Sequence, residues 1–278
     1  MSAFAATALV LSLAAAQPAA AFGFGKAKPA APATAAPAQP QAAARPPARQ
    51  KASAQDRKMA ERLDPLARAA FWAREVETDA SDPEAGVALS QALRAMAKYE
   101  DAIEAAQRVL VAHPNNADAL LEVARAQIGR GQGFYAIEPA RQAQALVPRD
   151  WRAPSLLGVA YEQAERPEEA LAAHRQALAL APDNPAALCN LALFYAGHGD
   201  TAQAETLLRT AAAKPDASMA VRQNLALVLG LQGRLDEAEK IARQDLPPDV
   251  VANNIAYLRS ATGPAGQTRS WEGLRSGQ

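Results

Sequence analysis

Three asparagines recur in a shared sequence context in the second half of the chain. Asn190 and Asn224 each open the phrase NLAL, and Asn254 opens the similar phrase NIAY. An asparagine side chain carries both a hydrogen-bond donor and an acceptor, so a row of asparagines can hold the backbone of an extended peptide. The alternative is that each amide bonds to a neighbouring helix and only fixes the packing. Peptide binding is therefore the first functional hypothesis.

The residue types that perform catalysis or bind metals form no recognisable pattern. His113, His174 and His198 are unevenly spaced, and Cys189 is the only cysteine, which excludes an intramolecular disulfide and a multi-thiolate metal site. No GxSxG, P-loop or HExxH motif occurs. We therefore expect no enzymatic activity, no metal and no cofactor, and we interpret Cys189 as a small apolar residue of a helix.

The asparagines belong to a repeat of 34 residues that five alanines mark: Ala102, Ala136, Ala170, Ala204 and Ala238. A 34-residue period with small residues in register resembles that of tetratricopeptide (TPR) helix pairs. In these pairs a small residue in the second helix lets the first helix approach closely. Together with an alanine-rich composition and few aromatic residues, the period predicts an all-α fold, a TPR helix-turn-helix solenoid of about five repeats.

Turn residues and prolines set the predicted boundaries. The repeats are expected at 83–116, 117–150, 151–184, 185–218 and 219–248. An atypical helix pair is expected before them, from about Arg57 to Thr78 with a break at Pro65, and a capping helix after them, at 249–260. Repeat five departs from the pattern, because Asp245 replaces a small residue and Pro247-Pro248 end the second helix early. Residues expected to cover the last apolar face are Ile255, Ala256 and Leu258.

The two ends of the chain differ from the repeat domain in composition. Residues 1–21 contain an uncharged apolar run followed by small residues, which is typical of the signal peptide of an exported protein. An uncleaved membrane anchor and a buried helix are the alternatives. Residues 22–55 predict a disordered Ala/Pro-rich linker, and residues 261–278 a disordered tail. No cysteine lies near the expected cleavage site after Ala21, so there is no lipobox. Membrane association is expected only through partners or an uncleaved N-terminus.

The charge distribution argues against nucleic acid as a partner. Five of the 29 basic residues precede the first acidic residue, Asp56, which leaves 24 basic against 29 acidic residues in the rest of the chain. Phosphate recognition requires clustered lysine and arginine, which a mildly acidic domain lacks.

Repeat proteins of this class bind partners on the concave surface formed by their first helices. Reading the corresponding positions gives a charged first part, including Glu84, Asp118 and Glu122, and a neutral second part that includes Ser155, Val159 and Cys189. The residues that we predict to line a peptide-binding groove are Arg94, Arg125, Arg152, Glu162, Asn190, Leu193, Gln223, Asn224, Leu227 and Asn254.

Four phrases resemble one family beyond the general repeat. They are ARAAFWAREVETD (67–79), QGFYAIEPARQAQALVPRDWR (132–152), SLLGVAYEQ (155–163) and RQNLALVLGLQGRLDEAEKIARQDLPPDVVANNIAYLR (222–259). Together they resemble the TadD-type TPR proteins of the tight adherence (Flp pilus) assembly system. The last phrase, with its early Pro247-Pro248 stop, is the most specific. The absence of a lipobox cysteine departs from the many family members that are lipoproteins.

The resemblance implies a periplasmic adaptor, at the outer-membrane periphery, whose partner is a protein or peptide segment. In that family the partner would be an outer-membrane secretin or another pilus assembly component. The adaptor would help the secretin to assemble, as a pilotin does. Two alternatives stay open: a general cell-envelope scaffold, and a cytoplasmic TPR co-chaperone whose apolar N-terminus is not an export signal.

Overall fold

The computed structural model describes residues 50–262, which form helices and contain no strand. The predicted signal peptide, most of the predicted linker and nearly all of the predicted tail lie outside these residues. The helices are α1 (Ala54–Ala60), α2 (Pro65–Thr78), α3 (Pro83–Ala95), α4 (Tyr99–Ala112), α5 (Ala117–Gly129), α6 (Gly133–Leu146), α7 (Arg152–Gln163), α8 (Pro167–Leu180), α9 (Pro185–Gly197), α10 (Thr201–Ala212), α11 (Met219–Leu231), α12 (Leu235–Ala242) and α13 (Pro248–Thr262). The predicted all-α TPR fold is confirmed.

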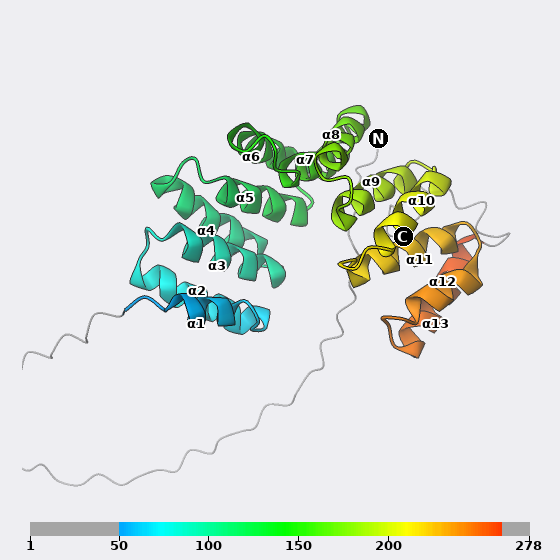
Figure 1. Cartoon of the computed structure of the whole chain (residues 1–278), viewed down its shortest axis with the longest axis horizontal. Coiled ribbons are helices and arrows are strands. Elements are labelled where there is room, and N and C mark those ends of the chain that lie inside the picture. The colour runs from blue at the N-terminus through cyan, green and yellow to red at the C-terminus, as the bar shows by residue number, and fades with distance from the viewer. Residues whose placement is uncertain (1–49, 263–278) are drawn as a thin grey trace, which may run out of the picture. The chain divides into compact units, whose positions relative to one another are not determined.

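The helices stack in chain order as antiparallel pairs (Figure 1). The first helix of each repeat also packs against the first helix of the next, from α3 through α5, α7, α9 and α11 to α13. Second helices of successive repeats lie further apart within the described part and meet through long side chains, as Gln144 of α6 and Gln176 of α8 do at 3.1 Å. The first helices are therefore packed more closely together than the second helices. We call the surface formed by the first helices the inner surface.

Short polar residues and prolines start the helices at the predicted places. The side chains of Asp82, Asn116 and Asn184 each accept hydrogen bonds from backbone N–H groups in the first turn of α3, α5 and α9. Pro83 and Pro185 occupy the first helical position, where a missing N–H costs nothing. The start of each repeat is thus encoded locally.

The alanine series is completely buried between paired helices. All five alanines are on second helices and have no solvent-accessible surface: Ala102, Ala136, Ala170, Ala204 and Ala238. On the facing helix of repeat three, Gly158 lies against the buried His174 ring, and a Cβ added to this glycine would lie 2.3 Å from the ring Cε1. Helix pairs approach so closely that only a small side chain fits on one side.

A left-handed residue joins the two helices of every repeat. Its φ is positive at Gly131 (73°), Gly199 (85°) and Gly233 (80°), and also at the non-glycine residues Ala97 (57°) and Glu165 (57°). These five positions share one place in the 34-residue repeat. Glycine adopts this conformation without the steric cost that a Cβ brings.

We predict that Ala97→Gly stabilises the protein by about 0.5–1 kcal/mol, because relief of the left-handed strain outweighs the added flexibility of the unfolded chain. The matched control is Gly131→Ala in the next repeat, which should destabilise by about 1 kcal/mol. Thermal unfolding of both variants measures the effect. Equal shifts in the same direction would contradict the shared turn conformation.

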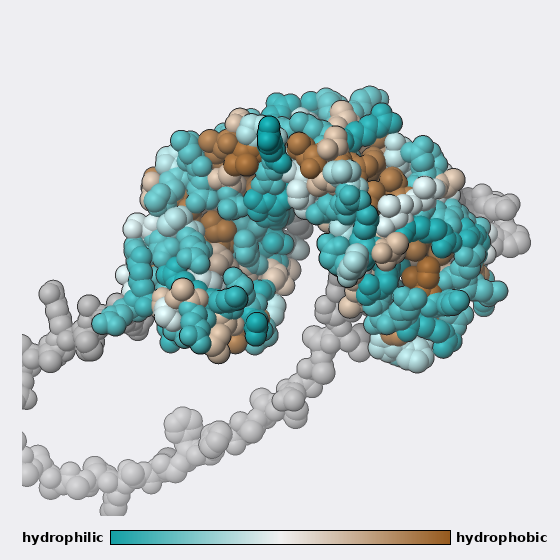
Figure 2. All heavy atoms as spheres, viewed as in Figure 1, coloured by the Kyte–Doolittle hydropathy of each residue, from teal (hydrophilic) through white to brown (hydrophobic). Residues whose placement is uncertain are grey.

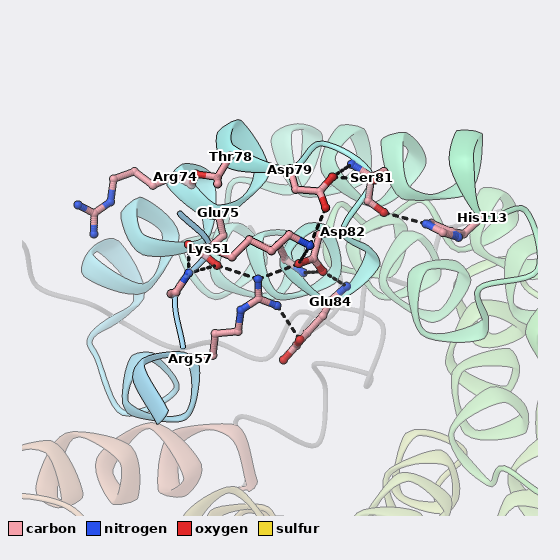
Figure 3. Close-up of polar contacts among 12 residues, drawn as sticks. Lys51, Arg57, Arg74, Glu75, Thr78, Asp79, Ser81, Asp82, Glu84 and His113 are labelled. Atoms are coloured by element: carbon pink, nitrogen blue, oxygen red, sulfur yellow. Dashed lines mark hydrogen bonds and ion pairs between the residues drawn. The ribbon is translucent and has the colours of Figure 1, made fainter. Parts of the chain in front are cut away.

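An ion-pair network fastens α1 to the first repeat (Figure 3). The Arg57 guanidinium donates at 2.7 Å to each of three carboxylates, those of Glu75, Asp82 and Glu84. The Glu75 carboxylate also accepts from the Ala52 backbone N–H at 3.1 Å. Burial is the largest single influence and favours the neutral form of Asp82. The hydrogen bonds from Arg57 and the Ala85 N–H, together with the charges of Arg57 and Lys51, outweigh it and lower the Asp82 pKa.

We expect Arg57→Ala to detach α1 and leave the repeats folded. Removing one partner of a nearly buried pair typically costs about 3–5 kcal/mol, and here the loss is limited to the cost of releasing one short terminal helix. Amide hydrogen exchange of residues 54–60 should accelerate by about tenfold or more while the melting temperature changes little. The neighbouring exposed Lys58, as Lys58→Ala, serves as the control. Unchanged exchange in Arg57→Ala would contradict this role.

The irregular fifth repeat has two structural causes, an ion pair at Asp245 and the packing of α13 on the end of the stack. Asp245, which stands where a small residue was expected, forms a two-pronged ion pair with Arg222 of α11 at 2.6 and 2.7 Å. That hydrogen bond lowers the Asp245 pKa. Helix α13 then covers the last apolar face with Val251, Ile255 and Leu258. Ala256 was also expected there but is exposed, because successive residues of an α-helix point roughly 100° apart and Ala256 directly follows the buried Ile255.

Candidate functional site

The structure places two of the three predicted asparagines in contact with the preceding repeat. The Asn190 side-chain amide donates to Ser155 Oγ at 2.8 Å, and the Asn224 amide donates to Cys189 Sγ at 3.2 Å. These bonds link successive first helices, as the packing alternative requires. Within residues 50–262 neither amide oxygen accepts a hydrogen bond, so both are left as acceptors beside the inner surface. Asn254 on α13 is exposed and does not continue the series of inter-repeat bonds.

An exposed apolar row runs beside these asparagines. Leu193 is 36% exposed and Leu227 is 42% exposed, and both lie one helical turn after an asparagine, on α9 and α11. Tyr257 takes the same place after Asn254 on α13 and is also exposed. The three side chains therefore offer apolar surface next to polar groups that can orient a bound peptide.

The predicted charged groove residues pair with one another. Arg94 and Arg125 both contact the Glu122 carboxylate, and Arg152 contacts Asp118 at 2.9 Å and Asp150 at 2.6 Å. Glu122 was expected to line the groove, but it is fully buried beneath the two arginines. The remaining guanidinium surface, not the carboxylate, faces solvent.

Glu162 holds a buried histidine. Its Oε1 lies 2.6 Å from Nε2 of His174, which is buried against Gly158 and lies beside Phe194. The carboxylate thereby accepts a hydrogen bond from a ring that would otherwise leave that nitrogen unsatisfied in the core. We assign Glu162 a packing role as well as its place on the inner surface.

Two further predicted positions are tied to the scaffold. Gln223 donates to Asp245 at 3.3 Å, beside the ion pair with Arg222. Cys189 is buried, and burial raises the pKa of its thiol, while the Asn224 amide opposes this effect. The thiol therefore stays protonated and behaves as the small apolar residue that the sequence predicted.

Sequence reasoning missed a hollow at the start of the inner surface. This cavity of about 320 Å³ is lined by residues of α2, α3 and α5, among them Trp72, Glu84 and Asp118. Arg68 also lines it, and the Arg68 Nε is buried without a hydrogen-bond partner in the described structure. The charged positions 84 and 118 gave part of the signal, but the hollow depends on how α2 packs against α3.

The described residues carry neither a group of side chains that could hold a metal ion nor a membrane-spanning helix. Residues 50–262 contain no group of three or more His, Cys, Asp or Glu side chains that could hold a metal ion. Within the same range, every helix is too short or too polar to cross a membrane. On the face drawn in Figure 2, hydrophobic residues form small separate areas among hydrophilic ones.

Comparisons with known proteins agree with this architecture. Three models described as tetratricopeptide repeat match the chain, one at residues 87–132 and 136–185, one at 161–220 and one at 218–246. No curated protein sequence matches the chain.

Two solved structures are similar to this one. A thermophilic TPR protein of Thermus thermophilus is 26% identical, with a TM-score of 0.58 over 63% of this chain and 98% of that chain. A chain of the Cut9–Hcn1 hetero-tetramer of the APC/C is 17% identical, with a TM-score of 0.61 over 79% of this chain and 42% of that chain. The second likeness shows the fold alone.

The repeat period, the helix pairs and these matches together define a helical-repeat protein of the kind that mediates protein–protein interactions. The chain belongs to the tetratricopeptide repeat family.

Proposed function

We propose that this protein is a non-catalytic adaptor that binds an extended segment of a protein partner on its inner surface. The observation that carries the proposal is the exposed row of Leu193, Leu227 and Tyr257 beside Asn190 and Asn224. Apolar side chains supply binding energy, and the amide oxygens of the asparagines orient a peptide backbone. Tetratricopeptide repeat proteins are in general scaffolds, which is consistent with the absence of a catalytic motif.

The proposed setting is the periplasm, in Flp pilus assembly, with an outer-membrane secretin or another assembly component as the partner. Support comes from the four sequence phrases that resemble TadD-type proteins, above all the segment 222–259 with its early stop. The Arg222–Asp245 ion pair gives that segment a structural purpose, since it anchors the turn after α12 to α11.

Fractionation and gene neighbourhood test this setting. The proposal expects the mature protein in the envelope fraction, and genes for a pilus ATPase, a secretin and a prepilin peptidase beside its own. A cytosolic full-length product would favour a co-chaperone. An envelope location without pilus genes would favour a general envelope scaffold.

We predict that Asn190→Ala combined with Asn224→Ala weakens partner binding more than it weakens folding. Each substitution removes one partly exposed inter-repeat hydrogen bond, worth about 0.5–1.5 kcal/mol, but also removes the peptide-facing amide oxygen. Pull-down from an envelope extract and thermal unfolding separate the two effects. Full partner recovery with a lowered melting temperature would assign the asparagines to packing only.

A further inference from the structure

The inner surface of the second repeat contains a carboxylate with no exposure to solvent. Glu122 of α5 lies under two guanidinium groups, with its Oε2 2.9 Å from Arg94 Nε and its Oε1 2.5 Å from Arg125 Nη1. Arg94 reaches it from α3 of the preceding repeat, while Arg125 comes from the next turn of α5. One carboxylate thus fixes two arginines side by side from different repeats.

Burial of this carboxylate is costly, and packing alone does not explain it. Removing a carboxylate from water costs several kcal/mol, and an apolar residue of similar volume often packs at least as well. One arginine would also have been enough to neutralise Glu122. The arrangement instead places two cations on one buried anion, so Glu122 by itself balances only one of the two arginines.

The two arginines still have donors to offer. Arg94 uses only its Nε and Arg125 only one Nη in hydrogen bonds within the described structure. Their side chains are 34% and 23% exposed, and none of their nitrogens is among the buried atoms that lack a partner. The unused N–H groups therefore reach solvent at the inner surface.

Neighbouring acids do not satisfy these donors. Asp150 is close enough to Arg125 to be influenced by its charge, but its oxygens accept from the Arg152 side chain and backbone. Arg152 also engages Asp118, the other acid on this side. Arg152 thus engages both acids, and neither of them is hydrogen-bonded to Arg94 or Arg125 in the described structure, although the three arginines and three carboxylates together are neutral.

We propose that Arg94 and Arg125 form a binding site for a carboxylate side chain of the partner, so that the bound segment is an acidic peptide. The inference rests on the proposed function, because it assigns chemistry to the same inner surface. Guanidinium groups held on a buried carboxylate are already oriented, and each can donate two parallel hydrogen bonds to a carboxylate. An acidic residue of the partner would bind here while apolar residues further along bind the leucine row.

The test uses the full chain and two synthetic probes, a hexaglutamate peptide and a hexaglutamine peptide, followed by fluorescence anisotropy at low ionic strength. Arg94→Lys with Arg125→Lys keeps the positive charge that Glu122 needs for folding but loses the forked donor geometry. The control pair is Arg108→Lys with Arg243→Lys. Both arginines are exposed and each contacts a single carboxylate; Arg108 lies on the second helix α4, and Arg243 directly follows the second helix α12.

We expect hexaglutamate to bind the unaltered protein more tightly than hexaglutamine, and we expect the Arg94/Arg125 variant to weaken it by about tenfold while the control pair leaves it unchanged. Equal binding of the two peptides, or equal loss in both arginine variants, would overturn the site. A third outcome separates this inference from the proposed function. If the Leu193/Leu227 variant loses the partner, but the unaltered protein binds hexaglutamate no more tightly than hexaglutamine, this inference alone is overturned and the proposed function stands.

Discussion

Ala170→Leu should destabilise the protein by about 1–3 kcal/mol, because the alanine side chain has no accessible surface and the third repeat has no room for three more carbon atoms. Ala170 lies on α8 among Leu157, Ala160 and Tyr161 of α7. Leucine would force the two helices apart or move these side chains out of their preferred rotamers. In a domain of this size the loss corresponds to a fall in melting temperature of roughly 2–4 °C per kcal/mol.

The matched control for this prediction is on the same helix. Ala172 lies two residues further along α8 and is exposed, so Ala172→Leu introduces the same side chain without overpacking. Circular dichroism melts of both variants measure the difference. An unchanged melting temperature for Ala170→Leu would show that the alanine series does not mark the helix contact.

The second large effect concerns binding. Leu193→Asp combined with Leu227→Asp should reduce affinity for the envelope partner by about 100-fold, since each charge removes apolar contact and must be desolvated when the partner binds. Both leucines are partly exposed in the unbound protein, so the folded state should tolerate the charges. The affinity is measured by immobilising each variant on a surface and passing envelope extract, or the partner once it has been isolated, over it.

Leu180→Asp provides the control for this double substitution. Leu180 is 37% exposed, which is close to the 36% of Leu193. It is the last residue of α8, which is a second helix and does not form the inner surface. Its substitution should leave capture unchanged. Equal loss of the partner in both variants would indicate a general solubility or folding effect and not an inner binding surface.

The fold could be predicted because its determinants are local and repeat. The small residue at Ala102, the cap at Asp82 and Pro83, and the turn glycine at Gly131 each act within one helix pair, and the 34-residue period then copies the pair along the chain. The same numbering placed Leu193 and Leu227 at equivalent inner positions. Their exposure agrees with that placement.

Contacts between repeats could not be read in the same way. The Asn190 bond to Ser155 and the burial of Glu122 under Arg94 depend on how far one first helix is rotated against the next. A few degrees decide whether a polar side chain faces solvent or its neighbour. The Arg57 network likewise joins residues whose approach is set by packing of α1 on α2 and α3. These features needed the three-dimensional arrangement.

Site-specific photo-cross-linking in living cells tests the central claim most directly. A photoreactive amino acid replaces Leu227 on the inner surface, or Val111, which is 86% exposed on the second helix α4, in otherwise unaltered protein. The account predicts a cross-linked partner from position 227 and none from position 111, and mass spectrometry of the adduct should find an extended acidic segment. Adducts from position 111 with none from position 227 would contradict binding at the inner surface.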